Sequence, residues 1–377
     1  MGIDAVFTER YWAAVPWGFW ALVFFVFGTI VGSFVNVCIH RMPRGESVVS
    51  PPSHCPHCQY AIPWYLNLPL LTWLYLRGCC RNCGAPITVR YFLVELLTGL
   101  AFLACWLGFG ERSAWVALIY AGFIAALIAA SFIDFEHFII PDEITLGGVG
   151  VGFLVSLLVP DLHRVETSAA ALERSILGII VGASVVYGIL RLSKLLYGRQ
   201  RFNLPADTRI FFTETALELP DRSIPYEDIF YRKSDTIVLQ AKSVELVDRG
   251  YAQVAVRLSP NRLLIGSDEF KPEEVGHLEV VTDKIVVPRE AMGLGDVKFM
   301  AAIGAFLGWQ AVLFSLMLSA MIGAAVGLSL VALKRGELSS SRLPYGPYLA
   351  TAAVVWIFWG PTLVAWWFGF WERPFRV

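Results

Sequence analysis

The sequence predicts a mainly α-helical, polytopic membrane protein, a bundle of about eight spans that carries a small inserted β-rich domain. Its 377 residues are 56% hydrophobic and only 16% charged, which is far from the composition of an ordinary soluble domain. Apolar stretches of helix length recur along most of the chain, and a membrane-spanning helix needs about 20 such residues. The formal net charge is -1, so no overall basic field indicates binding to nucleic acid.

Hydropathy and length place the predicted spans. The fourth is short, and the sixth can cross the bilayer only if protein covers its ends. Glycine-rich patches at 147–152 and 323–327 suit close helix packing. The eight spans are expected near residues 17–39, 91–109, 113–133, 144–159, 171–192, 298–309, 311–333 and 346–371.

The distribution of arginine predicts the orientation of the spans. The segment 40–90 carries five arginines and one acid, so the positive-inside rule places it in the cytoplasm. Alternation then places 134–143 and 334–342 inside, and 160–173 and the C-terminal tail outside. The stretch before the first span is mixed in charge and no small-residue cleavage site follows the span, so that span is expected to remain as a membrane anchor.

Residues 198–288 break the pattern of apolar spans. Charge rises there, and apolar residues alternate with polar ones in segments rich in β-branched side chains, which predicts strands at 236–240, 252–257 and 278–282. Residues 271–274 are expected to form a surface loop. The predicted organisation is a first span at 1–39, a cytoplasmic subdomain with paired cysteines at 40–90, spans that include Asp134 at 91–197, a soluble β-rich insert at 198–288, and Asp296 with the last spans at 289–377.

Four of the seven cysteines form two pairs, in Cys55-Pro-His-Cys58 and Cys80-Arg-Asn-Cys83. This spacing is typical of two knuckles that close a tetrahedral thiolate site around zinc. Four protein ligands leave no open position, so the metal is expected to be structural. The alternatives are free structural cysteines or a redox pair, and Cys79 could compete with Cys80 for the metal.

Asp134 and Asp296 stand where apolar, helix-length segments meet polar ones. A carboxylate at membrane depth is costly, so it indicates a functional site. Two carboxylates that share one proton can hydrolyse a peptide bond, because the ionised group activates water and the protonated group donates to the scissile carbonyl. The alternative is that each aspartate caps a helix or lies solvated at the interface.

Other ionisable residues leave the assignment open. Composition alone does not say which acid near Asp134 reacts, since Glu136, Asp142 and Glu143 follow it closely. Asp142 follows Pro141 at an expected helix start, where a capping role is favoured. Glu95, within the second span, is expected either to pair with an arginine or to serve a site. Lys298 could bias the aspartate pair toward its ionised member.

Several motifs resemble those of bacterial type IV prepilin peptidases. The resemblance covers about Gly28 to Pro160 and Pro288 to Ala350. The motif from Asp134 to Asp142 and the motif Arg289-Glu-Ala-Met-Gly-Leu-Gly-Asp-Val-Lys298 are similar to that family's two aspartate motifs. Similarity to the family's amino-terminal half lies in Gly32–Ser47, Pro51–Cys58, Leu76–Gly78, Cys80–Cys83 and Arg90–Gly99.

The resemblance implies an intramembrane aspartyl endopeptidase of the bacterial inner membrane. Such an enzyme cuts the short basic leader of type IV prepilins or type II secretion pseudopilins after a glycine, on the cytoplasmic side. Asp134 and Asp296 would be the catalytic pair, and zinc would be held by Cys55, Cys58, Cys80 and Cys83. Bifunctional members also methylate the new amino terminus from S-adenosyl-L-methionine. Members that only cleave lack the cysteine-bearing segment, so its presence favours methylation.

The chain departs from the family pattern at two places. The β-rich insert stands where a short link is usual, and Cys79 stands where a basic residue is common. We expect the insert to be a docking or regulatory module in the cytoplasm. Two other functions remain open: a proton-coupled transporter, which predicts further acids deep in the spans beyond Glu95, and an inactive scaffold for pilus assembly, against which both intact aspartates argue.

Overall fold

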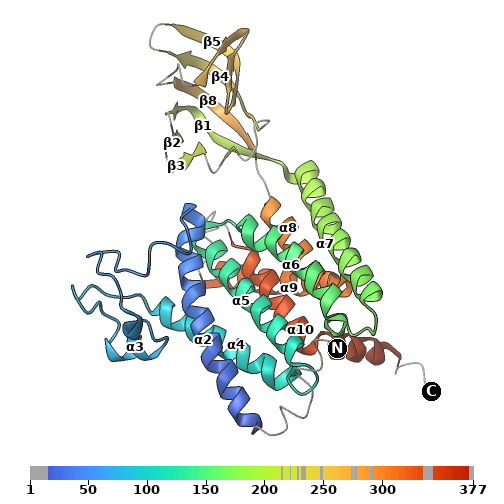
Figure 1. Cartoon of the computed structure of the whole chain (residues 1–377). Helices are drawn as coiled ribbons and strands as arrows, with labels where there is room; N and C mark the ends of the chain where they lie inside the picture. The colour runs from blue at the N-terminus through green and yellow to red at the C-terminus, as the bar shows by residue number, and fades with distance from the viewer. Residues whose placement is uncertain are drawn as a thin grey trace. The chain divides into compact units, whose positions relative to one another are not determined.

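The structure is a computed structural model of the whole chain (Figure 1). The residues it describes are 16–213, 215–220, 222–226, 229–230, 235–246, 249–272, 275, 278–288, 293–333 and 343–372. The start of the predicted first domain, the loop at 334–342, the motif residues 289–292 and half of the expected loop at 271–274 lie outside them. The chain divides into two compact units, residues 1–186 with 294–377, and residues 187–293.

Helices dominate the first unit, so the mainly α-helical prediction is confirmed. Loops join them, and short helices punctuate the loop that carries the cysteines. The elements are α2 (Trp17–Arg41), η2 (Met42–Arg44), η3 (Trp64–Leu66), α3 (Leu71–Tyr75), α4 (Val89–Phe109), α5 (Ala114–His137), α6 (Asp142–Leu158), η4 (Pro160–His163), α7 (Ser168–Tyr197, which runs on into the second unit), α8 (Leu294–Leu307), α9 (Trp309–Leu333) and α10 (Gly346–Glu372).

The count of eight spans is not confirmed. Among the described residues, six helices are long and apolar enough to cross a membrane, which makes this a polytopic membrane protein: Trp17–Arg44, Val89–Phe109, Ala114–His137, Ser168–Leu195, Trp309–Leu333 and Gly346–Trp367. The two remaining predicted spans are helices, but they are too short. At 1.5 Å per residue, α6 is about 26 Å long and α8 about 21 Å, against a hydrocarbon core of about 30 Å. Pro160 follows the end of α6, and Gly308, at φ +80°, follows the end of α8.

Small residues let α8 approach its neighbours closely. A methyl group added to Gly178 of α7 would overlap the carbonyl oxygen of Gly304 on α8, so the two backbones are in direct contact. On α6, a methyl group added to Gly152 would lie 2.8 Å from Cβ of Ala305. Side chains along most of α8 are therefore buried, as expected of a helix that is apolar on every face. The glycine patch at 147–152 thus serves packing through Gly152, as its composition predicts.

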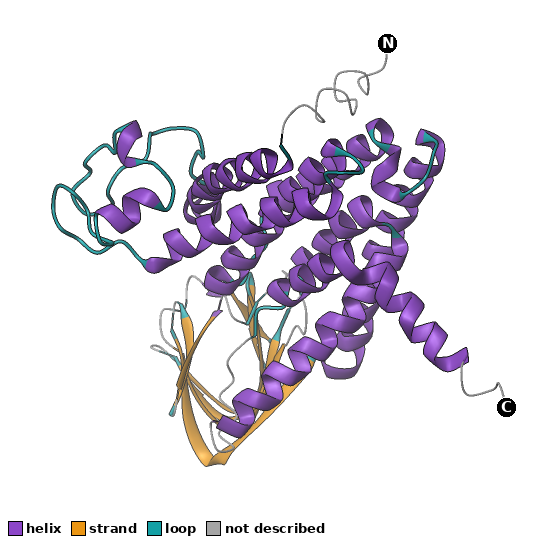
Figure 2. Ribbon diagram, turned by 90° about the horizontal axis from the view of Figure 1, so that it is seen from below, coloured by secondary structure: helices purple, strands orange, loops and turns teal. Residues whose placement is uncertain are grey.

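The second unit contains a single eight-stranded antiparallel sheet, and Figure 2 shows that strands are confined to this part of the chain. The strand order is β3-β2-β1-β8-β4-β5-β6-β7. The first and last strands, β1 and β8, pair with each other inside the sheet, so the chain enters and leaves it on adjacent strands. The strands are β1 (Arg199–Phe212), β2 (Ala216–Leu219), β3 (Arg222–Pro225), β4 (Ile237–Glu245), β5 (Gly250–Ser259), β6 (Arg262–Ile265), β7 (Asp268–Phe270) and β8 (Leu278–Pro288).

The three strands expected from the sequence are present as β4, β5 and β8, each longer than predicted. Buried and more exposed side chains alternate along these strands. The buried ones, such as Leu239, Val256 and Val280, belong to one hydrophobic core. Ser259 pairs with Arg262 across a two-residue turn that contains Pro260, at a turn signal between β5 and β6.

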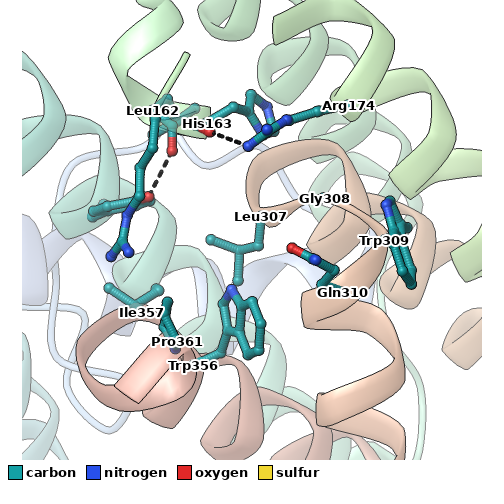
Figure 3. Close-up of a pocket in the computed structure, with 12 residues that line it drawn as sticks. Leu162, His163, Arg174, Leu307, Gly308, Trp309, Gln310, Trp356, Ile357 and Pro361 are labelled. Carbon is teal, nitrogen blue, oxygen red and sulfur yellow. Dashed lines mark hydrogen bonds between the residues drawn. The ribbon is translucent and has the colours of Figure 1, made fainter. Parts of the chain in front are cut away.

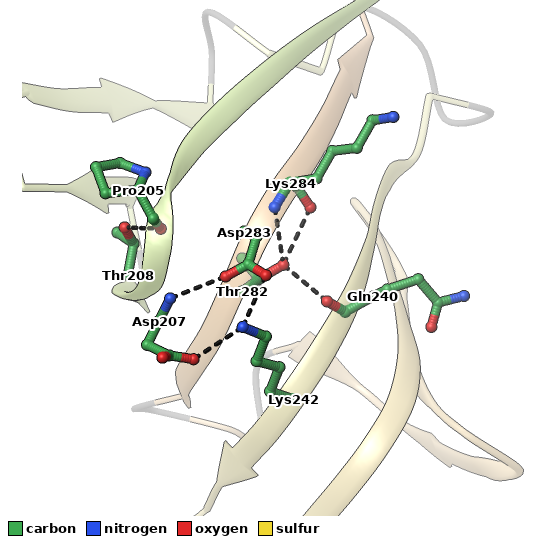
Figure 4. Close-up of polar contacts among 8 residues, drawn as sticks. All are labelled: Pro205, Asp207, Thr208, Gln240, Lys242, Thr282, Asp283 and Lys284. Carbon is green, nitrogen blue, oxygen red and sulfur yellow. Dashed lines mark hydrogen bonds and ion pairs between the residues drawn. The ribbon is translucent and has the colours of Figure 1, made fainter.

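A polar cluster marks an irregularity in the pairing of β1 with β8. The register of β1 against β8 shifts between Asn203 and Thr208, and Asp207 adopts φ +60° at that point. Its backbone amide donates to Asp283 at 2.8 Å, and Lys242 bonds both carboxylates, at 2.9 Å to Asp207 and 2.7 Å to Asp283 (Figure 4). The ion pairs among these three side chains hold the bulge in one conformation. Because the side chains are exposed, the pairs contribute little to the free energy of unfolding.

The contact between α7 and α8 predicts opposite effects for two Gly→Ala variants. Gly178→Ala should destabilise the protein by about 2 kcal/mol or more, because the methyl group meets backbone that must move. Gly147→Ala should be neutral or stabilising by up to about 1 kcal/mol, because nothing lies within 4 Å and alanine favours a helix. Thermal unfolding in detergent compares the two, and equal shifts would show that the close contact does not exist.

Candidate active site and cysteine cluster

The first aspartate is buried at the start of another helix. Asp134 lies in the last turn of α5 and is 6% exposed. Its Oδ2 accepts a hydrogen bond of 2.8 Å from the backbone N–H of Gly346, the first residue of α10. A methyl group at position 346 would lie 2.7 Å from that oxygen, so only glycine leaves room for the carboxylate. The positive end of the α10 dipole also favours a carboxylate at this place.

The second aspartate lies at the end of the bundle where α5 ends. Asp296 is in the first turn of α8 and is 9% exposed. Ile140 contacts both motif segments: a methyl group on Gly295 would lie 3.5 Å from its Cβ, and one on Gly346 would lie 3.2 Å from its Cδ1. The segments that carry Asp134 and Asp296 therefore meet around one isoleucine, although they are far apart in the sequence.

The structure distinguishes Asp134 from the acids that follow it. Glu136 and Asp142 are exposed and occupied by ion pairs, Glu136 with Arg90 and Asp142 with Lys298 at 2.6 Å. Asp142 begins α6 at the predicted helix start, but its carboxylate bonds Lys298 of α8, and no side chain caps the helix. Lys298 is thus held by Asp142. The buried acid of this stretch is Asp134.

Glu95 joins the second span to the cysteine-bearing loop. Its Oε2 accepts a hydrogen bond of 2.8 Å from the backbone N–H of Leu70, which has φ +60°. This contact is with a backbone amide and not with an arginine, and a role of Glu95 in a site stays a prediction. The carboxylate fixes the loop against the first turns of α4.

The two cysteine pairs have the same backbone structure. In the first knuckle, the carbonyl of Cys55 accepts from Gln59 N–H at 2.9 Å, and in the second the carbonyl of Cys80 accepts from Gly84 N–H at 2.9 Å. Gln59 and Gly84 both have positive φ, at 56° and 70°. Each first cysteine also donates its N–H to the carbonyl five residues later, at 3.0 Å and 2.8 Å. The knuckles are therefore a structural repeat, and this geometry turns both sulfurs of each pair toward one point.

The four sulfurs have the spacing of a tetrahedral metal site. All four lie within 4.8 Å of one another, with 3.9 Å between Cys55 and Cys83 and 4.0 Å between Cys58 and Cys80. A tetrahedron with zinc–sulfur bonds of 2.3 Å has sulfurs about 3.8 Å apart. Zinc therefore fits between these residues as they stand. Cys79 is exposed, and its thiol donates to the carbonyl oxygen of Arg77 at 3.7 Å. It therefore lies outside the four-cysteine cluster.

One sulfur of the cluster has a donor of its own. The side-chain amide of Asn82 lies 3.6 Å from Cys58 Sγ. This hydrogen bond is the largest cause that lowers the pKa of the Cys58 thiol to about 6. A thiolate is the form that binds a metal, so Asn82 favours the ligating state.

A pocket of about 270 Å³ opens at the other end of the bundle (Figure 3). Tyr120, in its wall, precedes Asp134 by fourteen residues of α5, or about 21 Å. Buried His163 also lines it, with Nε2 2.8 Å from the hydroxyl of Ser156. Arg174 donates to the carbonyl oxygen of His163 at 2.8 Å. Burial, with a smaller effect of Arg174, lowers the pKa of His163 to about 4. This network is structural and separate from the aspartates.

Sequence reasoning missed Gly346 and His163. A glycine directly before Pro347 at the start of a span was the available signal for Gly346, because proline favours the first turn of a helix. No local pattern marked His163, whose burial depends on three helices that pack around it.

Two family models match the chain. The bacterial peptidase A24 N-terminal domain matches residues 26–109, and the type IV leader peptidase family matches residues 118–202 and 275–328. The second match leaves out 203–274, which hold most of the sheet. The sheet is therefore an insertion relative to that model.

The names of similar curated proteins agree with these two family models. The prepilin leader peptidase/N-methyltransferase of Aeromonas hydrophila is 29% identical over 376 residues, which cover 93% of this chain and 94% of the relative. That of Myxococcus xanthus (strain DK1622) is 46% identical over 136 residues, 36% of this chain and 40% of the relative. The type 4 prepilin-like proteins leader peptide-processing enzyme of Escherichia coli O78:H11 is 39% identical over 199 residues, 48% of this chain and 69% of the relative. No solved structure matches the chain.

Fold and site together define a polytopic membrane protein that buries two carboxylates at one end of its bundle and carries a four-cysteine cluster in a loop between two of its helices. With the matches above, the chain belongs to the type IV leader peptidase family.

His163 predicts a loss of stability in acid. Its folded pKa of about 4 lies below the ordinary value of 6.5, so the unfolded chain takes up the proton first as the pH falls. Stability should therefore decline between about pH 6.5 and pH 4, by up to roughly 3 kcal/mol. Thermal unfolding in detergent at a series of pH values measures this decline. His163→Gln should show a shallower decline, and equal declines would contradict the assignment.

Proposed function

We propose that this chain is the membrane peptidase that removes the basic leader of type IV prepilins or type II secretion pseudopilins. The observation that carries the proposal is the burial of Asp134 and Asp296 in two segments that meet around Ile140 at one end of the bundle, in a chain of the leader peptidase family. A further acid of the same stretch, Glu136, is exposed and ion-paired, which favours Asp134 over Glu136 as the partner of Asp296 in a catalytic pair.

The pair would work as one acid and one base. One carboxylate takes a proton from water, and the other donates a proton to the scissile carbonyl, so the two titrate together rather than singly. The hydrogen bond from Gly346 N–H holds the Asp134 carboxylate in one orientation for this step. Burial of both carboxylates strengthens the electrostatic interactions within the site.

The arginines support a site on the cytoplasmic side of the inner membrane. Arg41 and Arg44 end the first membrane span, and Arg90 at the start of α4 pairs with Glu136 beside Asp134. These positive charges therefore lie on the side of the bundle where the aspartates lie, and the positive-inside rule assigns that side to the cytoplasm. The inserted sheet would face the same compartment as a docking or regulatory module.

The cysteine cluster would hold a structural zinc ion. Cys55, Cys58, Cys80 and Cys83 would supply four thiolates, which leaves no position for a substrate, so the metal would hold the two knuckles together. The names of the relatives support a second activity, N-methylation of the new amino terminus with S-adenosyl-L-methionine as the methyl donor.

Replacing either aspartate should abolish cleavage. Asp134→Asn and Asp296→Asn should each lower the rate of leader removal by about a hundredfold or more, because neither single carboxylate can act as both acid and base. Each variant is co-expressed with a tagged prepilin, and mass spectrometry follows the loss of the leader. Glu143→Gln, an exposed acid at the start of α6, is the control and should cleave normally. Normal cleavage by either aspartate variant would remove the proposed pair.

Two adjacent cysteines test the metal site. Cys80→Ser should lose bound zinc because one of four ligands is removed, whereas Cys79→Ser should retain it because that thiol lies outside the cluster. The zinc content of the purified proteins, measured by elemental mass spectrometry, compares the two. Equal loss in both variants, or full retention in both, would be inconsistent with a four-cysteine site.

A further inference from the structure

The cysteine-bearing loop exposes an apolar surface that no other described part of the chain covers. Six large apolar side chains between η3 and the end of α3 are from 47% to 82% exposed. We call this surface the aromatic rim, and its members are Trp64, Tyr65, Leu68, Leu71, Leu74 and Tyr75.

The inserted sheet provides a comparison within the same chain. Among its described residues, from Arg199 to Pro288, no large hydrophobic side chain is exposed. Its apolar residues face one core, as expected of a domain surrounded by water. The aromatic rim also belongs to a segment between two spans, yet it does not follow this rule. An exposed apolar patch of this kind marks a surface that binds protein or membrane.

Charge distinguishes between these two partners. From Ser47 to Leu76 the chain contains no Asp, Glu, Lys or Arg. Surface segments of soluble domains are usually about a quarter charged. Tryptophan and tyrosine are enriched at the boundary between headgroups and acyl chains, where their amphipathic rings lie at the level of the headgroups. Arg77 and Arg81, both exposed, follow the rim directly, where the chain would return to water.

Contacts with α4 set the depth of the rim. Leu70 donates its N–H to Glu95, which stands six residues after the first residue of α4, or about 9 Å along the helix. The ring of Trp73 lies 5.2 Å from that of Phe92, and its indole N–H donates to the carbonyl of Ile87 at 3.3 Å. Figure 1 shows α3 beside the first part of α4 rather than beyond its end. The rim therefore lies level with the first turns of a membrane span.

The rim also continues an apolar surface that lipid must cover. Val89, Leu93 and Leu97 are exposed along α4, a helix long and apolar enough to span the membrane. Lipid around α4 lies at the level of the rim, since the rim lies beside the first turns of this helix. The same lipid can therefore cover the rim, and no second protein is needed.

We propose that the aromatic rim, residues 64–75, inserts into the interfacial layer of the bilayer that the helices span. Its occupant is phospholipid, the acyl chains and headgroups of the leaflet at the Asp134 end of the bundle. Insertion would hold the two cysteine knuckles against the membrane surface, so that they and the end of α5 face substrate from fixed positions. The proposal depends on the membrane placement of α4 and not on the proposed peptidase activity.

Site-specific photo-crosslinking tests the proposal. A photoreactive amino acid replaces Leu71 or Tyr75 in the full chain, and both positions are exposed enough to accept it without disturbing the fold. Val49 is the matched control: it is apolar, belongs to the same loop and is 85% exposed. The residues on either side of Val49 are held at the end of α2 by Arg41, which donates hydrogen bonds to the carbonyls of Ser47 at 3.0 Å and Pro51 at 2.7 Å. Val49 therefore lies beyond the end of a span.

Each purified variant is reconstituted in vesicles of phosphatidylethanolamine and phosphatidylglycerol, irradiated and digested, and mass spectrometry counts peptides that carry a phospholipid. We expect the yield of lipid adduct to be several-fold higher at Leu71 and Tyr75 than at Val49. Equal yields at the three positions would overturn the proposal. Crosslinks from Leu71 to a second polypeptide in place of lipid would overturn it as well, because they would show that protein covers the rim.

Discussion

The hydrogen bond between the Gly346 amide and the Asp134 carboxylate is the contact on which the candidate site depends. It joins α5 to α10 across 212 positions of the sequence, in a buried place where an unpartnered carboxylate would cost several kcal/mol. The start of α10 supplies the N–H that the carboxylate needs, and glycine supplies the space. Because the last helix must begin at this point, the end of the bundle is organised around Asp134.

The short helix α8 follows from the same arrangement. It carries Asp296 in its first turn, so it must begin where α5 ends, and it is too short to span the membrane alone. Glycine contacts with α7 and small-residue contacts with α6 bury it, and the ion pair between Lys298 and Asp142 ties its start to α6. A helix buried on all sides by protein does not need the length of a membrane span. Its rigidity then positions Asp296.

The cysteine-bearing loop shows how a small subdomain is attached to a membrane bundle. Its two knuckles repeat one backbone structure, so a metal ion between them would replace the hydrophobic core that so short a segment lacks. Glu95 attaches the loop to α4, and Arg90 attaches the start of α4 to the end of α5. A chain of polar contacts thus connects the cysteines to the region of Asp134.

The sequence by itself determined the apolar helices, the strands β4, β5 and β8, the paired cysteines and the two aspartate motifs, because composition, periodicity and spacing are local properties. Its count of eight spans is not confirmed, since hydropathy does not distinguish lipid from protein as the surroundings of α8. Only the tertiary structure decided which acid is buried, that Glu95 binds Leu70, and that Gly346 receives Asp134. These depend on which surfaces meet, and residues distant in sequence meet only when the whole bundle has packed.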